Sequence, residues 1–259
     1  MLLAISALKG YALEATDGDI GSVRDVLFDD QTWKIRWLVV DTGAWLSKRK
    51  VLVQPSSVNR IDLEREVIHF ELTKAQIEAS PDISSDEPVS RQVESRVYDY
   101  YRWDPYWGGS YFGPNALALP FGTDGLSGTS IDYERRDIIP DELGDPHLRS
   151  VSAVTGYHIN ATDGVVGHVE NFLFNEESWD IRYLIVDTRN WWPGQHVLLS
   201  PYTVRGINEA DQEIDVAVTR QLVKSSPPWD PVKLINQAYE EGLHRHYGWP
   251  GYGWPGYRF

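Results

Sequence analysis

The sequence contains two copies of one segment, and this duplication constrains the fold more than any other feature. Residues 5–81 align with residues 151–227 without a gap, at an offset of 146, and 29 of the 77 aligned positions are identical. Solenoid repeats are shorter and need three or more units, so two copies of this length indicate duplicated domains. The ungapped register gives equivalent loops equal lengths, which favours one shared fold.

Each copy carries the pattern of a mainly β domain. In the first copy, apolar residues alternate over 20–28, and a β-branched and aromatic run at 35–41 predicts a buried central strand. We also expect strands at 4–8 and 50–55, a final hairpin, and a short helix within 73–81 that is capped by Thr73. The expected fold class is mainly β, with two small antiparallel β-barrels of five or six strands, short terminal helices and an irregular linker.

Two segments lie outside the repeat. Residues 83–146 carry twelve acidic residues against five arginines and show no periodicity, which is typical of a linker. Residues 229–248 predict a helix with Asp230 as N-cap and Pro231 at its first position. The chain is therefore divided into a first domain at 1–82, an acidic aromatic linker at 83–146, a second domain at 147–228, and a C-terminal helix and Gly/Trp/Tyr/Pro-rich tail at 229–259.

Three motifs recur in both copies and resemble those of the PRC-barrel domain. They are G-Y-x₃-A-T-D-G-x₂-G-x-V-x₃-L-F, then W-x-I-R-[WY]-L-[VI]-V-D-T, then V-L-[VL]-x-P-x₂-V. The PRC-barrel is the small β-barrel of the cytoplasmic part of the photosynthetic reaction centre H subunit and of a ribosome maturation factor. The resemblance implies a tandem PRC-barrel protein of the type found in bacteria. It implies no activity, because this fold is a module used in unrelated settings.

The stretch ATDGDIGSVRDVLFDD at 15–30 raises the question of a cation site, since it holds five aspartates. The second copy replaces most of them, and only Asp17 persists, as Asp163, each followed by glycine. Asp-Gly between strands is a hairpin signature, because glycine adopts positive φ. We therefore interpret Asp17-Gly18 and Asp163-Gly164 as structural turns, and the remaining acids as dispensable for the fold.

No residue set in the chain predicts catalysis or metal binding. Arg36 and Asp41 recur as Arg182 and Asp187, which favours a solvated strand end or a salt bridge to a neighbouring strand over a proton-relay site. The seven histidines do not recur between the copies, and the chain has no cysteine. We expect no catalytic residue, no cofactor and no metal, and hence a non-enzymatic protein.

Tryptophans recur at two pairs of equivalent positions, Trp33/Trp179 and Trp45/Trp191, where they are expected to pack the barrel ends. Four others lie in the aromatic segments outside the repeat: Trp103, Trp107, Trp249 and Trp254. These four are a candidate interaction surface for a protein or glycan partner. The alternative is that linker and tail fold back on the barrels.

Charge and hydropathy disfavour some classes of partner and location. The net charge of −14 disfavours nucleic acid and an anionic membrane face. No apolar run is long enough for a transmembrane helix, and the N-terminus lacks the basic region of a signal peptide, so a cytoplasmic location is expected. The expected function is a protein-interaction or assembly module with a protein partner of unknown identity. The resemblance leaves two alternatives, an accessory protein of reaction-centre electron transfer and a ribosome-maturation-like binding module.

The arrangement of the two copies is also open at this stage. They can pack pseudo-symmetrically, as equal domains often do, or form a homo-oligomer, or stay independent on a long linker.

Overall fold

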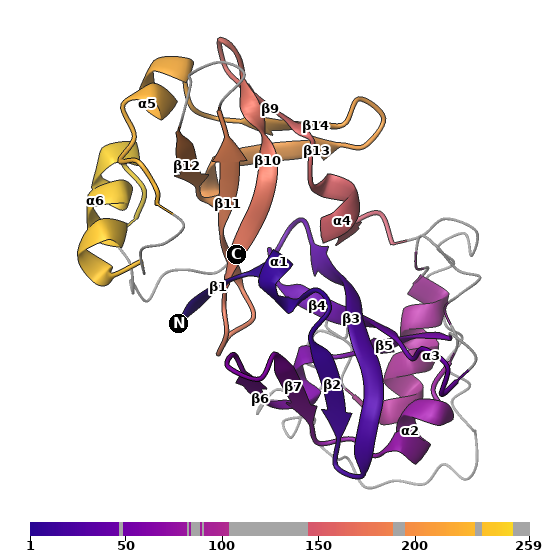
Figure 1. The fold of residues 1–259 in the computed structure, drawn as a ribbon. Helices are drawn as coiled ribbons and strands as arrows, with labels where there is room; N and C mark the ends of the chain where they lie inside the picture. Colours follow the sequence, from indigo (N-terminus) through magenta and orange to yellow (C-terminus); the bar gives the residue numbers. More distant parts are fainter. Residues whose placement is uncertain are drawn as a thin grey trace, which may run out of the picture.

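The computed structural model describes residues 1–46, 49–81, 83, 89, 91–103, 145–188, 195–230 and 235–250. We call residues 1–103 the first half and residues 145–250 the second half. Two seven-stranded sheets and few helices make up these residues, which confirms the mainly β class. Figure 1 shows the two halves one above the other, with the N-terminal strand crossing between them.

The first half supplies six strands of one sheet, in the order β5-β4-β3-β2-β7-β6. Their bounds are β2 Ala12–Ala15, β3 Gly18–Asp29, β4 Ile35–Asp41, β5 Lys50–Val53, β6 Val58–Asp62 and β7 Val67–Phe70. The second half repeats the order as β12-β11-β10-β9-β14-β13. These strands are β9 His158–Ala161, β10 Gly164–Asn175, β11 Ile181–Asp187, β12 His196–Leu199, β13 Val204–Asn208 and β14 Glu213–Val216.

Two features of the sheets differ from the expectation of closed antiparallel barrels. One pair in each sheet is parallel, β2 with β7 and β9 with β14. The described pairings also form an open path, since β5 and β6 do not pair with each other and neither do β12 and β13. A seventh strand, which sequence reasoning did not predict, completes each sheet.

That seventh strand comes from the other half. Strand β1, Leu2–Ala4, pairs with β10, with Leu2 opposite Asn175 and Ala4 opposite Leu173. Strand β8, Leu148–Ser150, pairs with β3, with Leu148 opposite Asp29 and Ser150 opposite Leu27. The two pairings are related by the same 146-residue offset as the sequence repeat. Each half therefore gives a strand to the other, as the two subunits of an isologous dimer do.

The hydrophobic core continues across the contact between the halves. One cluster of buried side chains contains residues of both sheets. Phe28 of the first half and Phe172 of the second lie with ring centroids 5.6 Å apart at the junction. Main-chain bonds cross here too, from Ile35 N to Trp179 O at 2.9 Å and from Ile181 N to Trp33 O at 2.7 Å. The two halves thus share one core.

Short helices follow the strands at equivalent places. They are α1 Ile5–Leu8, α2 Lys74–Glu78, α4 Val151–Val154 and α5 Arg220–Lys224, with 3-10 turns at Pro55–Ser57 and Pro201–Thr203. Helix α2 confirms the predicted helix, and Thr73 caps it through a capping box with Gln76. The strand predicted at 4–8 is wrong beyond residue 4, because residues 5–8 form α1 and bury Ile5 and Leu8.

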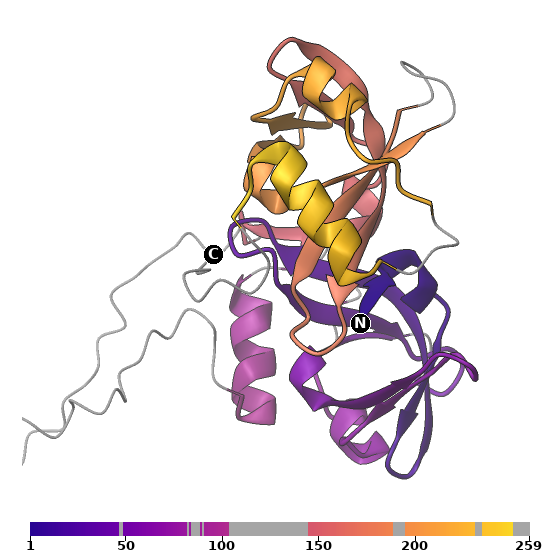
Figure 2. The same ribbon diagram turned by 90° about the vertical axis from the view of Figure 1, so that its left-hand side faces the viewer.

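Two longer helices cover the outer faces of the sheets, as Figure 2 shows. Helix α3, Arg91–Tyr101, lies where an irregular linker was predicted, and α6, Gln237–Tyr247, occupies the equivalent position of the second half. The N-cap of α6 is Asn236 rather than the predicted Asp230. Buried residues of α3 pack on Trp37, Val39 and Leu52. Each half is therefore a sheet with its core on one face and a helix on the other.

Candidate functional site

The two Asp-Gly turns fulfil a structural role in each half. Gly18 and Gly164 begin β3 and β10 with φ of 134° and 132°, which glycine adopts readily. The carboxylates of Asp17 and Asp163 accept 2.7 Å hydrogen bonds from the main-chain N–H groups of Lys74 and Arg220. The aspartate thus ties the turn to the first residue of the following short helix, which explains its presence in both copies.

The aspartates found in the first copy alone make contacts that the sequence did not predict. Asp25, which is Asn171 in the second copy, accepts hydrogen bonds from the hydroxyls of Ser150 at 2.5 Å and Ser152 at 2.7 Å. Asp30 pairs with His147 and Arg149. These partners all belong to the second half. Asp25 and Asp30 therefore lie in the contact between the two copies, a role that comparison of the copies did not predict.

Arg36 is buried within a group of carboxylates, so it is not a solvated strand end. Its guanidinium lies 2.5 Å from Asp29, 2.9 Å from Asp145 and 3.5 Å from Glu94. Glu94 also accepts a hydrogen bond from the Trp37 indole N–H at 2.5 Å. The salt bridge to a neighbouring strand is present, since Asp29 ends β3. Asp41 accepts a 2.9 Å hydrogen bond from Gly43 N.

The second half builds a different polar group at the same place. The Tyr183 hydroxyl lies 2.9 Å from Glu240 Oε1 and 2.9 Å from His244 Nε2, and all three residues are buried. Tyr183 is equivalent to Trp37, and Glu240 to Glu94. The outer helix is therefore fixed by a charged group in the first half and by an aromatic hydroxyl in the second.

Two of the four candidate tryptophans pack onto their own half. Trp103 stacks on Tyr101 with ring centroids 4.2 Å apart, and Trp249 stacks on Tyr247 at the same distance. Both are half-buried against the outer-face clusters. Trp107 and Trp254 lie outside the described residues. Trp33 and Trp179 are buried at the contact between the halves, and Trp191 is also outside the described residues.

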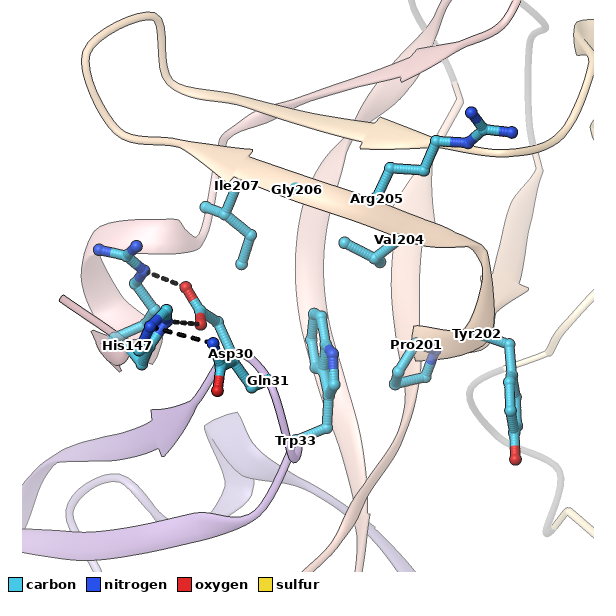
Figure 3. A pocket seen from close by; sticks show the side chains of 11 residues that line it. Asp30, Gln31, Trp33, His147, Pro201, Tyr202, Val204, Arg205, Gly206 and Ile207 are labelled. Atoms are coloured by element: carbon cyan, nitrogen blue, oxygen red, sulfur yellow. Dashed lines mark hydrogen bonds and ion pairs between the residues drawn. The ribbon is translucent and has the colours of Figure 1, made fainter. Parts of the chain in front are cut away.

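A cleft of about 460 Å³ opens where the two halves meet. This volume is within the usual range for ligand sites. Its lining combines the β3–β4 turn of the first half with β8, the 3-10 turn and β13 of the second: Asp30, Gln31, Trp33, His147, Arg149, Pro201, Tyr202, Val204, Arg205, Gly206 and Ile207. Figure 3 shows the polar side chains at one end and Tyr202 at the other.

Hydrogen bonds fix the polar end of the cleft. Asp30 accepts from Nδ1 of His147 at 2.9 Å and from Nε of Arg149 at 2.7 Å. The amide of Gln31 donates to Nε2 of His147 at 3.0 Å, which places the imidazole proton on Nδ1. Burial lowers the pKa of Arg149, but its hydrogen bonds and charge interactions with Asp30 and Glu209 outweigh burial and leave that pKa raised. Arg149 therefore stays charged and fully engaged.

The middle of the cleft is apolar. Val204 and Ile207 extend from β13 toward Trp33, whereas Arg205 extends away from it (Figure 3). In the described part of the chain, β13 pairs with β14 alone, so its other edge lines the opening of the cleft. The middle of the cleft suits apolar side chains of a ligand, because the Asp30 carboxylate and the Arg149 guanidinium at its polar end already pair with each other.

The described residues contain neither a metal-binding cluster nor a membrane-spanning helix. No group of three or more histidine, cysteine or acidic side chains there is arranged to hold a metal ion. No helix among them is long and apolar enough to cross a bilayer.

Comparison with known proteins finds similarity for the first copy. Residues 2–77 match the PRC-barrel domain. An uncharacterised protein of Deinococcus radiodurans is 36% identical to this chain over 85 residues, which are 32% of the chain and 30% of that protein. The chain thus matches less than a third of the length of this relative.

Sequence reasoning did not predict the cleft, and it did not predict that α3 and α6 are equivalent helices. Glu94, Tyr101 and Trp103 align with Glu240, Tyr247 and Trp249 at the same 146-residue offset, so the repeat continues beyond residue 81 at low identity. Three identities around a helix were the available signal. The cleft had no sequence signal, because its residues come from three separate segments, at 30–33, 147–149 and 201–207.

Proposed function

We propose that the chain is a non-enzymatic docking module built from two PRC-barrel-like domains, at 1–82 and 147–228, and that it presents the inter-half cleft to a protein partner. The reciprocal exchange of β1 and β8 carries this proposal, because it joins two small domains into one body with a shared core. A rigid body with a composite cleft favours binding, since little ordering entropy is lost on association.

Several features support docking over catalysis. The His147–Asp30 pair has the arrangement of a general base, but no serine, threonine or cysteine is among the described residues that line the cleft, and Tyr202 lies at its opposite end. The match of residues 2–77 to the PRC-barrel domain also favours a non-enzymatic module, because this domain is an adaptor-like unit.

An affinity pull-down from the native host tests the proposal. Tagged full-length chain is compared with Tyr202→Ala, which removes an exposed ring from the cleft, and with Ser56→Ala, the equivalent position in the first half. We expect a partner that is lost with Tyr202→Ala and kept with Ser56→Ala. Its identity would decide between a reaction-centre accessory protein, a ribosome-maturation-like module and another assembly.

Two results would contradict the proposal. One is the absence of any partner above the tag-only control. The other is turnover of a metabolite in an activity screen of the purified chain, abolished by His147→Ala, which would make the cleft an active site.

A further inference from the structure

We infer that the free edge of β13 binds an extended segment of a partner protein, which adds a strand to the second-half sheet and places apolar side chains in the cleft. This inference rests on the proposed docking function and specifies its ligand. It is carried by a difference between two equivalent strands, β6 and β13.

Both strands end their sheets. In the described part of the chain, β6 pairs with β7 alone and β13 with β14 alone. An edge strand directs alternate N–H and C=O groups away from its one partner, and these groups are a template for another chain. Natural proteins protect such edges with charged side chains and bulges. Both β6 and β13 have a register shift near their start.

The two strands differ at three equivalent positions, Asn59/Arg205, Arg60/Gly206 and Asp62/Asn208, and the inference rests on the second of these. In β6 this position is Arg60, whose guanidinium hydrogen-bonds His69 across the hairpin at 3.2 Å. In β13 it is Gly206, which is exposed and has no atom within 4 Å of where a Cβ would lie. A glycine within a strand often marks close approach by another backbone. At this position β6 thus carries a long charged side chain, and β13 carries none.

The cleft continues this open edge. Val204 and Ile207 point from β13 into the cleft (Figure 3), and Trp33 of the first half closes the apolar floor. An extended segment on β13 would direct alternate side chains toward this floor. The floor is part of the interface between the halves, so the binding site exists only when they are joined.

Charge indicates a basic segment. The β13–β14 hairpin carries one arginine, Arg205, against four acids: Glu209, which pairs with Arg149, and Asp211, Glu213 and Asp215. No histidine or lysine lies within residues 204–216. A lysine or arginine beside the apolar anchors would be attracted by this excess of carboxylates, which raises the association rate and makes it dependent on salt.

The test is a phage-displayed library of random ten-residue peptides, selected on the full-length chain with counter-selection on Gly206→Arg. We expect enriched peptides with alternating apolar residues and at least one lysine or arginine. A synthetic peptide of the enriched sequence should shift the amide resonances of residues 204–208, and Gly206→Arg should weaken its binding at least tenfold.

Two controls separate edge binding from other causes. Gly206→Ala leaves the edge accessible, so it should bind within about twofold of the parent chain. A peptide that is N-methylated on alternate backbone nitrogens cannot donate to the strand and should lose binding, whereas its side chains are unchanged.

The inference is overturned if no peptide is enriched against Gly206→Arg, or if the enriched peptide binds that variant as tightly as the parent. Its failure is distinguishable from failure of the docking function. A partner in the pull-down that is retained by Gly206→Arg would leave docking intact and move it to another surface.

Discussion

The two halves have the same backbone plan but hold each other with different side chains. Where the second half gives Ser150, Ser152 and Arg149 to the first, it meets the carboxylates of Asp25 and Asp30. Where the first half gives Ser6 to the second, it meets the neutral amide of Asn171, whose nitrogen donates to the Ser6 hydroxyl at 2.5 Å. The residue of the first half that is equivalent to Arg149 is the uncharged Leu3.

This difference makes the joined halves asymmetric. The backbone exchange is the same in both directions, but several of the side chains that meet across the two contacts differ. Mutations confined to the first-copy acids should therefore act on the contact between halves, and mutations of their second-copy equivalents should act less.

The largest expected loss of stability concerns the polar groups beneath the outer helices α3 and α6, and it should differ between the two halves. Arg36→Met removes the cation shared by buried Asp29, Glu94 and Asp145. Breaking a buried ion pair from one side costs about 3–5 kcal/mol. Arg182→Met should cost no more than about 1 kcal/mol, because Arg182 is only half-buried and the equivalent of Asp29 is the neutral Asn175. Denaturant unfolding of both variants measures the difference, and equal losses would refute it.

Alkaline pH should lower the stability of both halves to a similar extent. Burial raises the pKa of Tyr101 in the first half and of Tyr239 in the second, each to about 12. The unfolded chain loses these protons near pH 10, so the stability is intact below pH 10 and falls as the pH rises toward 12. The loss should be on the order of 2 kcal/mol per phenol.

Unfolding midpoints between pH 8 and 12 test this prediction. Tyr101→Phe and Tyr239→Phe should each reduce the slope by a similar amount. A slope that neither variant changes would mean that these phenols do not govern the alkaline limb.

Asp30→Asn should weaken the contact at the polar end of the cleft. It removes the charge that engages Arg149 and His147, at an expected cost of about 1–2 kcal/mol. The matched variant is Glu176→Gln in the second half, where the acid pairs with the exposed N-terminus at 3.0 Å. That loss should be within about 0.5 kcal/mol. Thermal denaturation of the two variants side by side is the measurement, and a larger effect for Glu176→Gln would reverse our interpretation.

The smallest effect is expected at Asp25. Asp25→Asn makes the first half resemble the second and keeps hydrogen-bonding capacity toward Ser150 and Ser152, so its cost should be about 0.5–1 kcal/mol. The exchange Asn171→Asp is the control. The double variant carries both Asp25→Asn and Asn171→Asp. If its stability equalled that of the parent chain, the preference for unlike halves would depend on residues besides this pair.

The sequence predicted the fold better than the site because the two have different physical origins. Alternation at 20–28 and the run at 35–41 reflect burial within one copy, and Ile20, Val23, Val26 and Phe28 are indeed buried. The strand exchange leaves no such pattern, since three residues of β1 are too few for a period. Helix α3 was not predicted, because its segment shares only three identities with that of α6. These are too few for the alignment of the copies to extend over the helix.

Comparison of the copies also led to one wrong inference. Residues that differ between copies were taken as dispensable, and Asp25 and Asp30 show the limit of that rule. Differences between duplicated domains mark the places where the copies meet as well as the places that are free to vary. Arg60 of β6 and Gly206 of β13 are equivalent positions at which the copies also differ.

The central claim is that strand exchange makes the two halves one body, and cleavage of the connection tests it directly. A protease site is inserted within residues 104–144, the chain is cut, and the products are examined by size-exclusion chromatography with light scattering and by denaturant unfolding. We predict that the two fragments elute together at the mass of the intact chain and unfold in a single transition. Separation of the fragments into two independently folded species would contradict the claim.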